Sequence, residues 1–141
     1  MATKAAHLQL VNVNQSALSH LAEDIEDFPE WVTIIAFYKA LHLIEAVFAT
    51  DERVRHTSDH RTRMRTLKQY RKYEQMYRHF RPLKAASEVA RYLSDNESRS
   101  SYSSFRDYMP PKVVESEIIG HRLRRIERSA DRLLKPGGPR N

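Results

Sequence analysis

The sequence predicts an all-α protein, folded as an up-down bundle of four to five helices within one domain. Three observations support this prediction. Apolar residues recur with the period of a helix in several segments, prolines stand where those segments begin or end, and no segment alternates like a strand. At 141 residues, the chain is long enough to bury a substantial core.

The most apolar stretch, residues 30–50, predicts the central helix of that bundle. Such a helix is about 30 Å long, which also matches the thickness of a bilayer core. Lys39, His42 and Glu45 lie in its middle, however, where a charge within a membrane costs about 2.5–3.5 kcal/mol. We therefore expect a soluble protein with no membrane partner, in which other helices cover this one on nearly every side.

Residues 1–13 show no clear period and are expected to form a loose arm. A first helix follows, capped by Asn14 or Ser16 and ending near Phe28, with apolar residues at the helical period. Pro29 ends this helix and starts the central one, because proline fits the first turn of a helix but not its interior.

Two further helices are expected after the charged segment 51–59. The third runs from about His60 to Phe80, and the fourth starts at Pro82 and runs to about Leu93. The cap of the third helix is Thr57, Ser58 or Asp59.

A Ser-rich loop, residues 94–105, separates these helices from the last one. The last helix is expected from about Pro111 to Lys135, because apolar residues repeat there at helical offsets and the sequence PGGPRN ends it. The helical domain is therefore expected to span residues 14–135, followed by a tail at residues 136–141.

The composition excludes several classes of function. The absence of cysteine excludes disulfides and thiolate zinc sites, and it fits a reducing cytoplasm. With only three glycines, the chain cannot build the glycine-rich phosphate loops of common nucleotide-binding proteins. The N-terminal residues contain no apolar run like that of a secretory signal. We expect a cytoplasmic protein that uses no metal and no cofactor.

Positive charge is concentrated in one segment. Residues 53–81 contain ten Lys or Arg and two acids, a net charge of +8, whereas the whole chain carries +6. One basic helix on a balanced body is typical of a protein with an anionic partner, nucleic acid first, although such a face can also be merely solvated. The candidate RNA-binding residues are Arg53, Arg61, Arg63, Arg65, Lys68, Arg71 and Lys72.

Aromatic residues interleave with these cations at helical spacing. Tyr70, Tyr73, Tyr77 and Phe80 can form a strip on which bases stack. The same spacing is also typical of a core face beside which Arg stems pack, so both interpretations stay open.

A polar seam runs along one side of the central helix. Tyr38, His42 and Glu45 follow one another at about one turn and can hydrogen-bond along the helix. A buried Glu45 would need a cation, and Arg91 is the candidate partner. The seam is either a satisfied polar group within the core or part of a functional surface.

Three stretches, in this order, resemble the HEPN domain family, and in particular its stand-alone prokaryotic members. They are FYKALHLIEAVFA at 37–49, HRTR at 60–63 and LKAASEVARY at 83–92, and the likeness covers about residues 14–134. The resemblance implies a HEPN-like helical bundle, often a homodimer. It also implies metal-independent RNA cleavage by a toxin or defence nuclease, or pairing with a nucleotidyltransferase-type antitoxin.

The RNase signature of that family is an Arg, four to six residues, and then a His. Arg55 and His60 fit it, with four residues between them, and Arg53 and His60 also fit it, with six. By this resemblance, His60 would move the proton of a ribose 2′-hydroxyl or of the leaving oxygen, and Arg55 would brace the phosphorane, giving a 2′,3′-cyclic phosphate. The free N–H groups at the start of the third helix would seat the phosphate. A second copy of the chain would supply the second His.

Three functions stay open at this point. The first is a HEPN-type endoribonuclease that cuts RNA by attack of the 2′-hydroxyl. The second is a non-catalytic HEPN module that binds RNA, a nucleotide or an antitoxin partner. The third is a structural homodimer that uses the apolar surface of the central and last helices.

Overall fold

The computed structural model describes residues 2–54, 57 and 59–135. Over these residues every regular element is helical, and an isolated β-bridge joins Ser94 to Ser101. The all-α bundle predicted from the sequence is confirmed, whereas the predicted tail at 136–141 lies outside the described residues. The helices are α1 Lys4–Ala22, α2 Pro29–Phe48, α3 His60–Gln69, α4 Glu74–Tyr92, α5 Phe105–Tyr108, α6 Pro111–Val113 and α7 Arg124–Leu134, with a 3₁₀ turn at Arg71–Tyr73 and a π-helical segment at Val114–Leu123.

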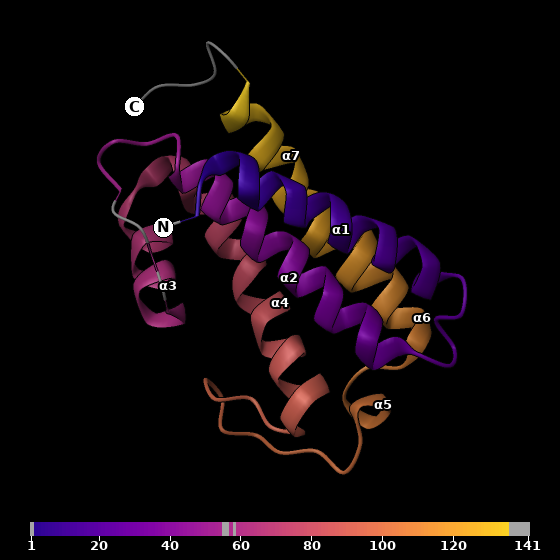
Figure 1. The fold of residues 1–141 in the computed structure, drawn as a ribbon. Helices are drawn as coiled ribbons and strands as arrows, with labels where there is room; N and C mark the ends of the chain where they lie inside the picture. Colours follow the sequence, from indigo (N-terminus) through magenta and orange to yellow (C-terminus); the bar gives the residue numbers. More distant parts are fainter. Residues whose placement is uncertain (1, 55–56, 58, 136–141) are drawn as a thin grey trace.

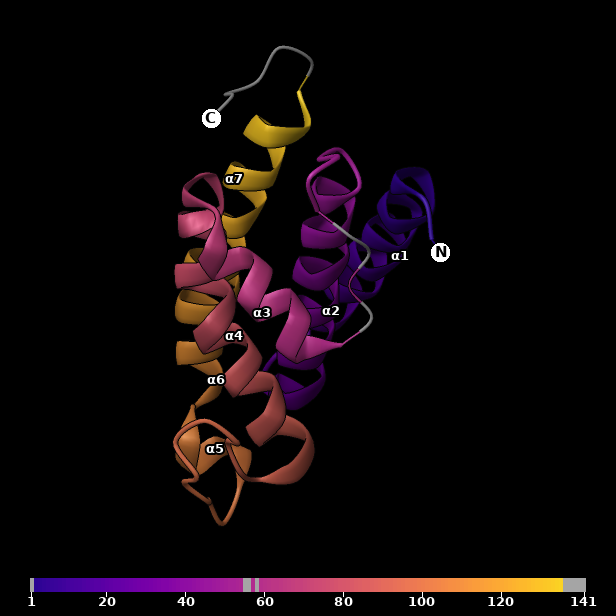
Figure 2. The same cartoon turned by 90° about the vertical axis from the view of Figure 1, so that its left-hand side faces the viewer.

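Helix α2 is the central helix, as predicted. It packs against α1, α4 and α7. Figure 1 shows α1 and α4 on opposite sides of α2, and Figure 2 shows α7 on the same side as α4. By length and composition alone α2 could span a membrane, but 72% of its most apolar window is buried inside the protein. Its mid-helix Lys39 is paired with Glu127 of α7 and also contacts Gln15 of α1. The polar middle of α2 is therefore satisfied within the bundle.

Helix α1 begins earlier than expected. The loose arm predicted over residues 1–13 is instead helical from Lys4 onward, with the Thr3 hydroxyl accepting a hydrogen bond from the Ala6 N–H at 3.1 Å. His7, Val11 and Leu18 are its buried residues. The apolar period was too weak to detect because a histidine occupies one of these inward positions.

The predicted third helix, 60–80, is two helices in the structure. Helix α3 ends at Gln69, Tyr70 is extended, and α4 starts at Glu74. The bend turns the fully buried Tyr73 into the core, where its hydroxyl donates to Asp51 at 2.8 Å and its ring packs on Phe48. As Figure 2 shows, α3 therefore crosses the side of the bundle formed by α2 and α4 instead of continuing along it.

Pro82 does not start a helix, contrary to the prediction, but lies inside α4. A proline at this position removes one intrahelical hydrogen bond and crowds the preceding turn. The helix nevertheless continues because Phe80 and Leu83, on either side of Pro82, are both fully buried in the core. Tertiary packing has overridden the local preference.

The chain after α4 forms a loop that folds back on itself. The Asp95 N–H donates to the Ser100 carbonyl at 3.0 Å, and the Tyr102 N–H donates to the Leu93 carbonyl at 2.8 Å. These bonds hold the predicted Ser-rich loop beside the end of α4. The last predicted helix, from Pro111, is confirmed as a run of α6, the π-helical segment and α7.

Candidate functional site

A buried ion pair joins the central helix to α3. The Arg63 Nε donates to Glu45 Oε1 at 2.7 Å, and both side chains are almost inaccessible, at 6% and 4% exposed. The Thr57 hydroxyl donates to the same carboxylate oxygen. The expectation that a buried Glu45 needs a cation is confirmed, but the cation is Arg63 and not Arg91. Arg63 therefore serves the core and is not available as the RNA-binding residue that was predicted.

The predicted polar seam is not a single cluster. Arg91 lies on α4, where its Nε donates to the Ser87 carbonyl at 3.2 Å and its guanidinium lies 5.6 Å from the Phe37 ring centre. Tyr38 is exposed. His42 turns toward α1, with its Nδ1 at 3.0 Å from the Nδ1 of His7. Burial, and then the neighbouring His7, lower the pKa of His42, so this ring is mostly neutral at pH 7.

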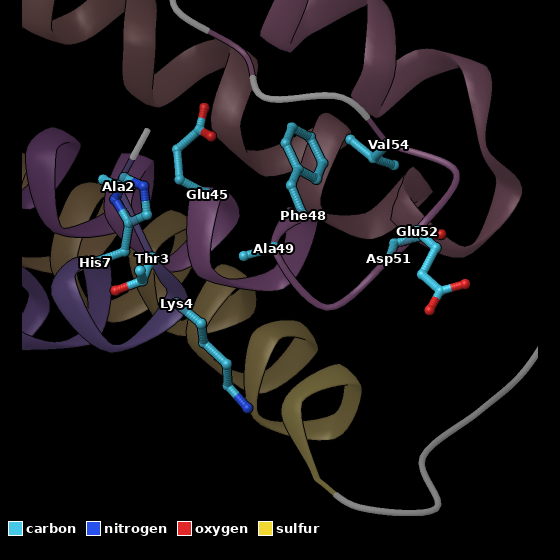
Figure 3. A pocket seen from close by; sticks show the side chains of 10 residues that line it. All are labelled: Ala2, Thr3, Lys4, His7, Glu45, Phe48, Ala49, Asp51, Glu52 and Val54. Carbon is cyan, nitrogen blue, oxygen red and sulfur yellow. The ribbon is translucent and has the colours of Figure 1, made fainter.

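A cavity of about 740 Å³ is lined by His7 and Glu45, among other residues. Figure 3 shows Glu45 between His7 on one side and Phe48 and Val54 on the other. Its other charged groups are Lys4, Asp51 and Glu52. Asp51 accepts hydrogen bonds from Arg53 and Tyr73 and pairs with Lys72, which holds the pKa of this carboxyl far below its usual range. Arg53 and Lys72, two of the predicted RNA-binding residues, are thus used to anchor the turn after α2.

His60 is the first residue of α3, and its ring touches the core. The ring centre lies 5.7 Å from that of Phe37, and Nδ1 lies 2.9 Å from Nη1 of Arg63. A guanidinium can only donate, so Nδ1 accepts and the neutral ring carries its proton on Nε2. Burial first, and then Arg63 and Lys84, lower the pKa of His60. The ring is therefore mostly neutral at pH 7, and Nε2–H is its donor.

The second residue of the predicted catalytic pair, Arg55, lies outside the described residues, so its distance from His60 is not described. The phosphate seat expected at the start of α3 is corrected by the structure. Asp59 caps the helix, and its carboxylate accepts the Thr62 N–H at 2.7 Å. The carboxylate occupies the position that a phosphate would take and would repel it.

A groove runs between α3 and α4, and we call it the α3–α4 groove. It consists of two cavities of about 880 and 450 Å³ that share Tyr77 and Arg81 as lining residues. The first cavity is lined by His60, Arg61, Met64, Tyr77, Arg81, Lys84, Ala85, Glu88, Asn96 and Glu97, and the second by Leu67, Lys68, Tyr70, Arg71, Glu74, Tyr77, Arg78 and Arg81.

The α3–α4 groove carries an excess of positive charge. Its three acids each pair with a cation of the groove: Glu74 with Arg78, Glu88 with Lys84, and Glu97 with Arg81. Three further cations, which make no ion pair with any described residue, are Arg61, Lys68 and Arg71. These three are the predicted RNA-binding residues that line the groove, whereas Arg65 is exposed but does not line it.

The aromatic strip predicted over residues 70–80 has two parts. Tyr73 and Phe80 are fully buried core residues. Tyr70 and Tyr77 are half-buried and line the α3–α4 groove, and the Arg53 guanidinium lies over the Tyr70 ring, 4.9 Å from its centre. The core interpretation is therefore confirmed for Tyr73 and Phe80, and the base-stacking interpretation stays open for Tyr70 and Tyr77.

Sequence reasoning missed the α4 wall of the groove. Tyr77, Arg81, Lys84 and Glu88 follow one another at spacings of four, three and four, which is one face of a helix. The interpretation of Pro82 as a helix start split this face in two. Among the described residues, no three metal-ligating side chains come close enough together to hold a metal ion.

Comparison with protein-family models, with curated proteins and with solved structures gives no match to this chain.

Proposed function

We propose that the protein binds single-stranded RNA in the α3–α4 groove. The proposal rests on the combination, within one groove, of two half-buried tyrosine rings with three cations that have no acidic partner among the described residues. Cations attract the phosphate backbone, and aromatic rings stack on bases of any sequence. The combination is typical of proteins that bind single strands.

Each part of the groove has a role in this proposal. Arg61, Lys68 and Arg71 contact phosphates, while Tyr70 and Tyr77 stack on bases. The Nε2–H of the neutral His60 ring donates a hydrogen bond to a phosphate oxygen. Single strands fit better than duplex because half-buried rings reach bases only when these are splayed out of a helix. The HEPN-like motifs favour RNA over DNA.

Cleavage of the bound RNA at His60, as in a HEPN-type endoribonuclease, is the second candidate. It is favoured by the position of the neutral His60 ring at the groove. While Arg63 holds Nδ1, however, Nε2 already carries a proton and cannot take one from a 2′-hydroxyl. Cleavage thus requires that Arg63 release the ring, and that Arg55 and a second proton-transfer group join the site.

A second copy of the chain could supply that second group. Trp31 and Tyr38 are exposed on one face of α2, and Phe28 is exposed just before the helix. Such apolar surface favours a homodimer or a nucleotidyltransferase-type partner. An RNA cleavage assay in EDTA, with wild type beside His60→Ala and Arg55→Ala, tests the nuclease. Cleavage by wild type alone, leaving cyclic phosphate ends, supports this candidate, and intact RNA with all three proteins rejects it.

RNA binding itself is tested by fluorescence anisotropy with a labelled single-stranded RNA, at several salt concentrations. The double variant Lys68→Ala/Arg71→Ala removes two groove cations. Its matched control, Lys112→Ala/Arg132→Ala, removes two exposed cations that do not line the groove. For a single strand, each lost phosphate contact makes the negative slope of log affinity against log salt shallower by about 0.7. We therefore expect the groove variant to reduce the magnitude of this slope by about 1.4, and the control to leave it unchanged. Equal slopes for both variants would place the RNA elsewhere.

A further inference from the structure

A carboxylate lies at the base of the basic groove. The Glu88 side chain is 7% exposed and lines the α3–α4 groove on its α4 side. Lys84 Nζ, at 3.0 Å, and Asn96 Nδ2, at 3.1 Å, both donate to its Oε2. An acid in this position repels phosphate, so the proposed phosphate contacts do not account for it. It suits a ligand group that donates hydrogen bonds.

The three side chains leave a defined set of polar atoms for a ligand. Because both contacts fall on Oε2, Oε1 of Glu88 is the acceptor that a ligand can use. Asn96 donates through Nδ2 to a carboxylate, which fixes the orientation of the amide and leaves Oδ1 as a second acceptor. The ammonium of Lys84 has three donors, of which Glu88 uses one. The set is two acceptors, Glu88 Oε1 and Asn96 Oδ1, beside the two remaining N–H groups of the Lys84 ammonium and the second N–H of the Asn96 amide.

This set complements one nucleobase better than the others. The Watson–Crick edge of guanine presents an acceptor, O6, and two donors, N1–H and the N2 amino group. Uracil matches the donor and the first acceptor, but its O2 would face Asn96 Oδ1, acceptor against acceptor. Adenine N1 and cytosine N3 are acceptors and would face the Glu88 carboxylate. Unpaired acceptors of this kind are strongly disfavoured when buried.

We propose that Lys84, Glu88 and Asn96 form a base-reading subsite that selects guanine in the bound RNA strand. Lys84 donates to O6, Glu88 accepts N1–H, and Asn96 accepts the N2 amino group. Tyr77, in the same cavity, offers a ring face for stacking. This inference rests on the proposed RNA-binding function, and it adds base preference to a groove whose other contacts are indifferent to sequence.

The test compares the affinities of nine-residue oligouridines that carry one central G, inosine, A, C or U, measured by anisotropy at one salt concentration. Inosine lacks the N2 amino group, so it reports the Asn96 contact alone. We expect wild type to prefer G over U by at least about fivefold, with inosine between them. GMP and AMP serve as competitors, and weak competition by both shows that the guanine is read within a strand.

Two variants separate the contacts. Glu88→Gln is expected to lose the preference for G over U while it still binds the all-uridine strand. Asn96→Ala, at an exposed loop position, is expected to fold normally and to lose only the preference for G over inosine. The control Glu115→Gln removes an exposed acid outside the groove and should keep both preferences.

The outcomes separate this inference from the function on which it rests. Equal affinity of wild type for all five strands would overturn the guanine subsite and leave RNA binding intact, as would a preference for another base. A preference for G that survives both Glu88→Gln and Asn96→Ala would also overturn it. Tight competition by GMP would overturn recognition within a strand. Failure to bind any strand would instead refute the proposed function.

Discussion

Arg63 contacts both the core of the protein and the edge of the α3–α4 groove. It neutralises the buried Glu45 of α2 and, through Nη1, holds the His60 ring at the edge of the groove. A change at this residue therefore affects both the core and the groove. Glu45 lies in the most apolar helix of the chain and its side chain is 4% exposed, so an unpaired carboxylate here would be poorly solvated.

Removal of this cation is expected to be costly. Arg63→Ala leaves the Glu45 carboxylate buried without a charge partner, and we expect it to lower the free energy of unfolding by about 3–5 kcal/mol. Urea denaturation measures this loss. Arg65→Ala on the same helix is the matched control, because Arg65 is exposed, and it should stay within about 0.5 kcal/mol of wild type. If Arg63→Ala lost less than about 0.5 kcal/mol, the Arg63–Glu45 ion pair would not stabilise the core as described.

His79 makes the stability of the protein depend on pH. The ring is buried and accepts a hydrogen bond from Arg122, and burial together with this cation lowers the pKa of His79 to about 4. Since the unfolded ring titrates near 6.5, protons bind the unfolded chain first as the pH falls below that value. The stabilisation is therefore complete above pH 6.5 and is lost toward pH 4.

His79→Gln tests this dependence, because a glutamine oxygen can accept the Arg122 hydrogen bond without titrating. Between pH 7 and pH 5 we expect the variant to lose about 2 kcal/mol less stability than wild type. Thermal or urea unfolding at the two pH values measures the difference. The exposed His20 is the control, and His20→Gln should follow the wild-type pH profile. Parallel profiles for His79→Gln and wild type would show that His79 does not titrate as assigned.

At the scale of the elements, the sequence predicted best where packing and local preference agree. Helix α2 and the C-terminal helical run were expected because their apolar residues are dense or strictly periodic. Helix α1 was missed over residues 4–13 because the buried His7 does not count as apolar. Pro82 was misjudged because the core burial of its neighbours, which no local pattern reveals, carries α4 through it.

A substitution at Pro82 measures how much stability this proline costs helix α4. Pro82→Ala restores a hydrogen bond to the Arg78 carbonyl inside α4 and removes the ring that crowds it. The gain is partly offset because alanine gives the unfolded chain more freedom. We expect a net stabilisation of about 2 kcal/mol, seen as a higher urea midpoint at an unchanged m-value. A lower urea midpoint would mean that the packing of the Pro82 ring contributes more stability than the hydrogen bond that alanine restores.

The candidate site was only partly predictable from the sequence, because the partners of its cations come from distant parts of the chain. The basic segment identified Arg61, Lys68 and Arg71, which line the groove. It could not separate them from Arg63 and Lys72, since the buried carboxylates that engage these two come from residues 45 and 51. The Glu45 partner was assigned to Arg91, whereas the fold brings Arg63 of α3 to this carboxylate. The groove exists only because the chain bends at Tyr70.

At the scale of the whole molecule, folding gathers the charge of one segment into one groove. Residues 53–81 carry a net charge of +8 in sequence. Arg63 pairs with a carboxylate in the core, and Arg53 and Lys72 pair with Asp51 in the turn after α2. The remaining cations of the groove lie between α3 and α4 beside the two half-buried tyrosines that line it. The strongest aromatic exposure lies elsewhere, at Trp31 and Tyr92, outside the groove.

That separation allows a direct test of where RNA binds. A single-stranded RNA containing 4-thiouridine is irradiated with the protein, and the crosslinked residues are identified by mass spectrometry. The account predicts crosslinks at Tyr70 and Tyr77, which line the groove, and their loss in Lys68→Ala/Arg71→Ala. Crosslinks concentrated at Trp31 or Tyr92, which are more exposed but lie outside the groove, would contradict it.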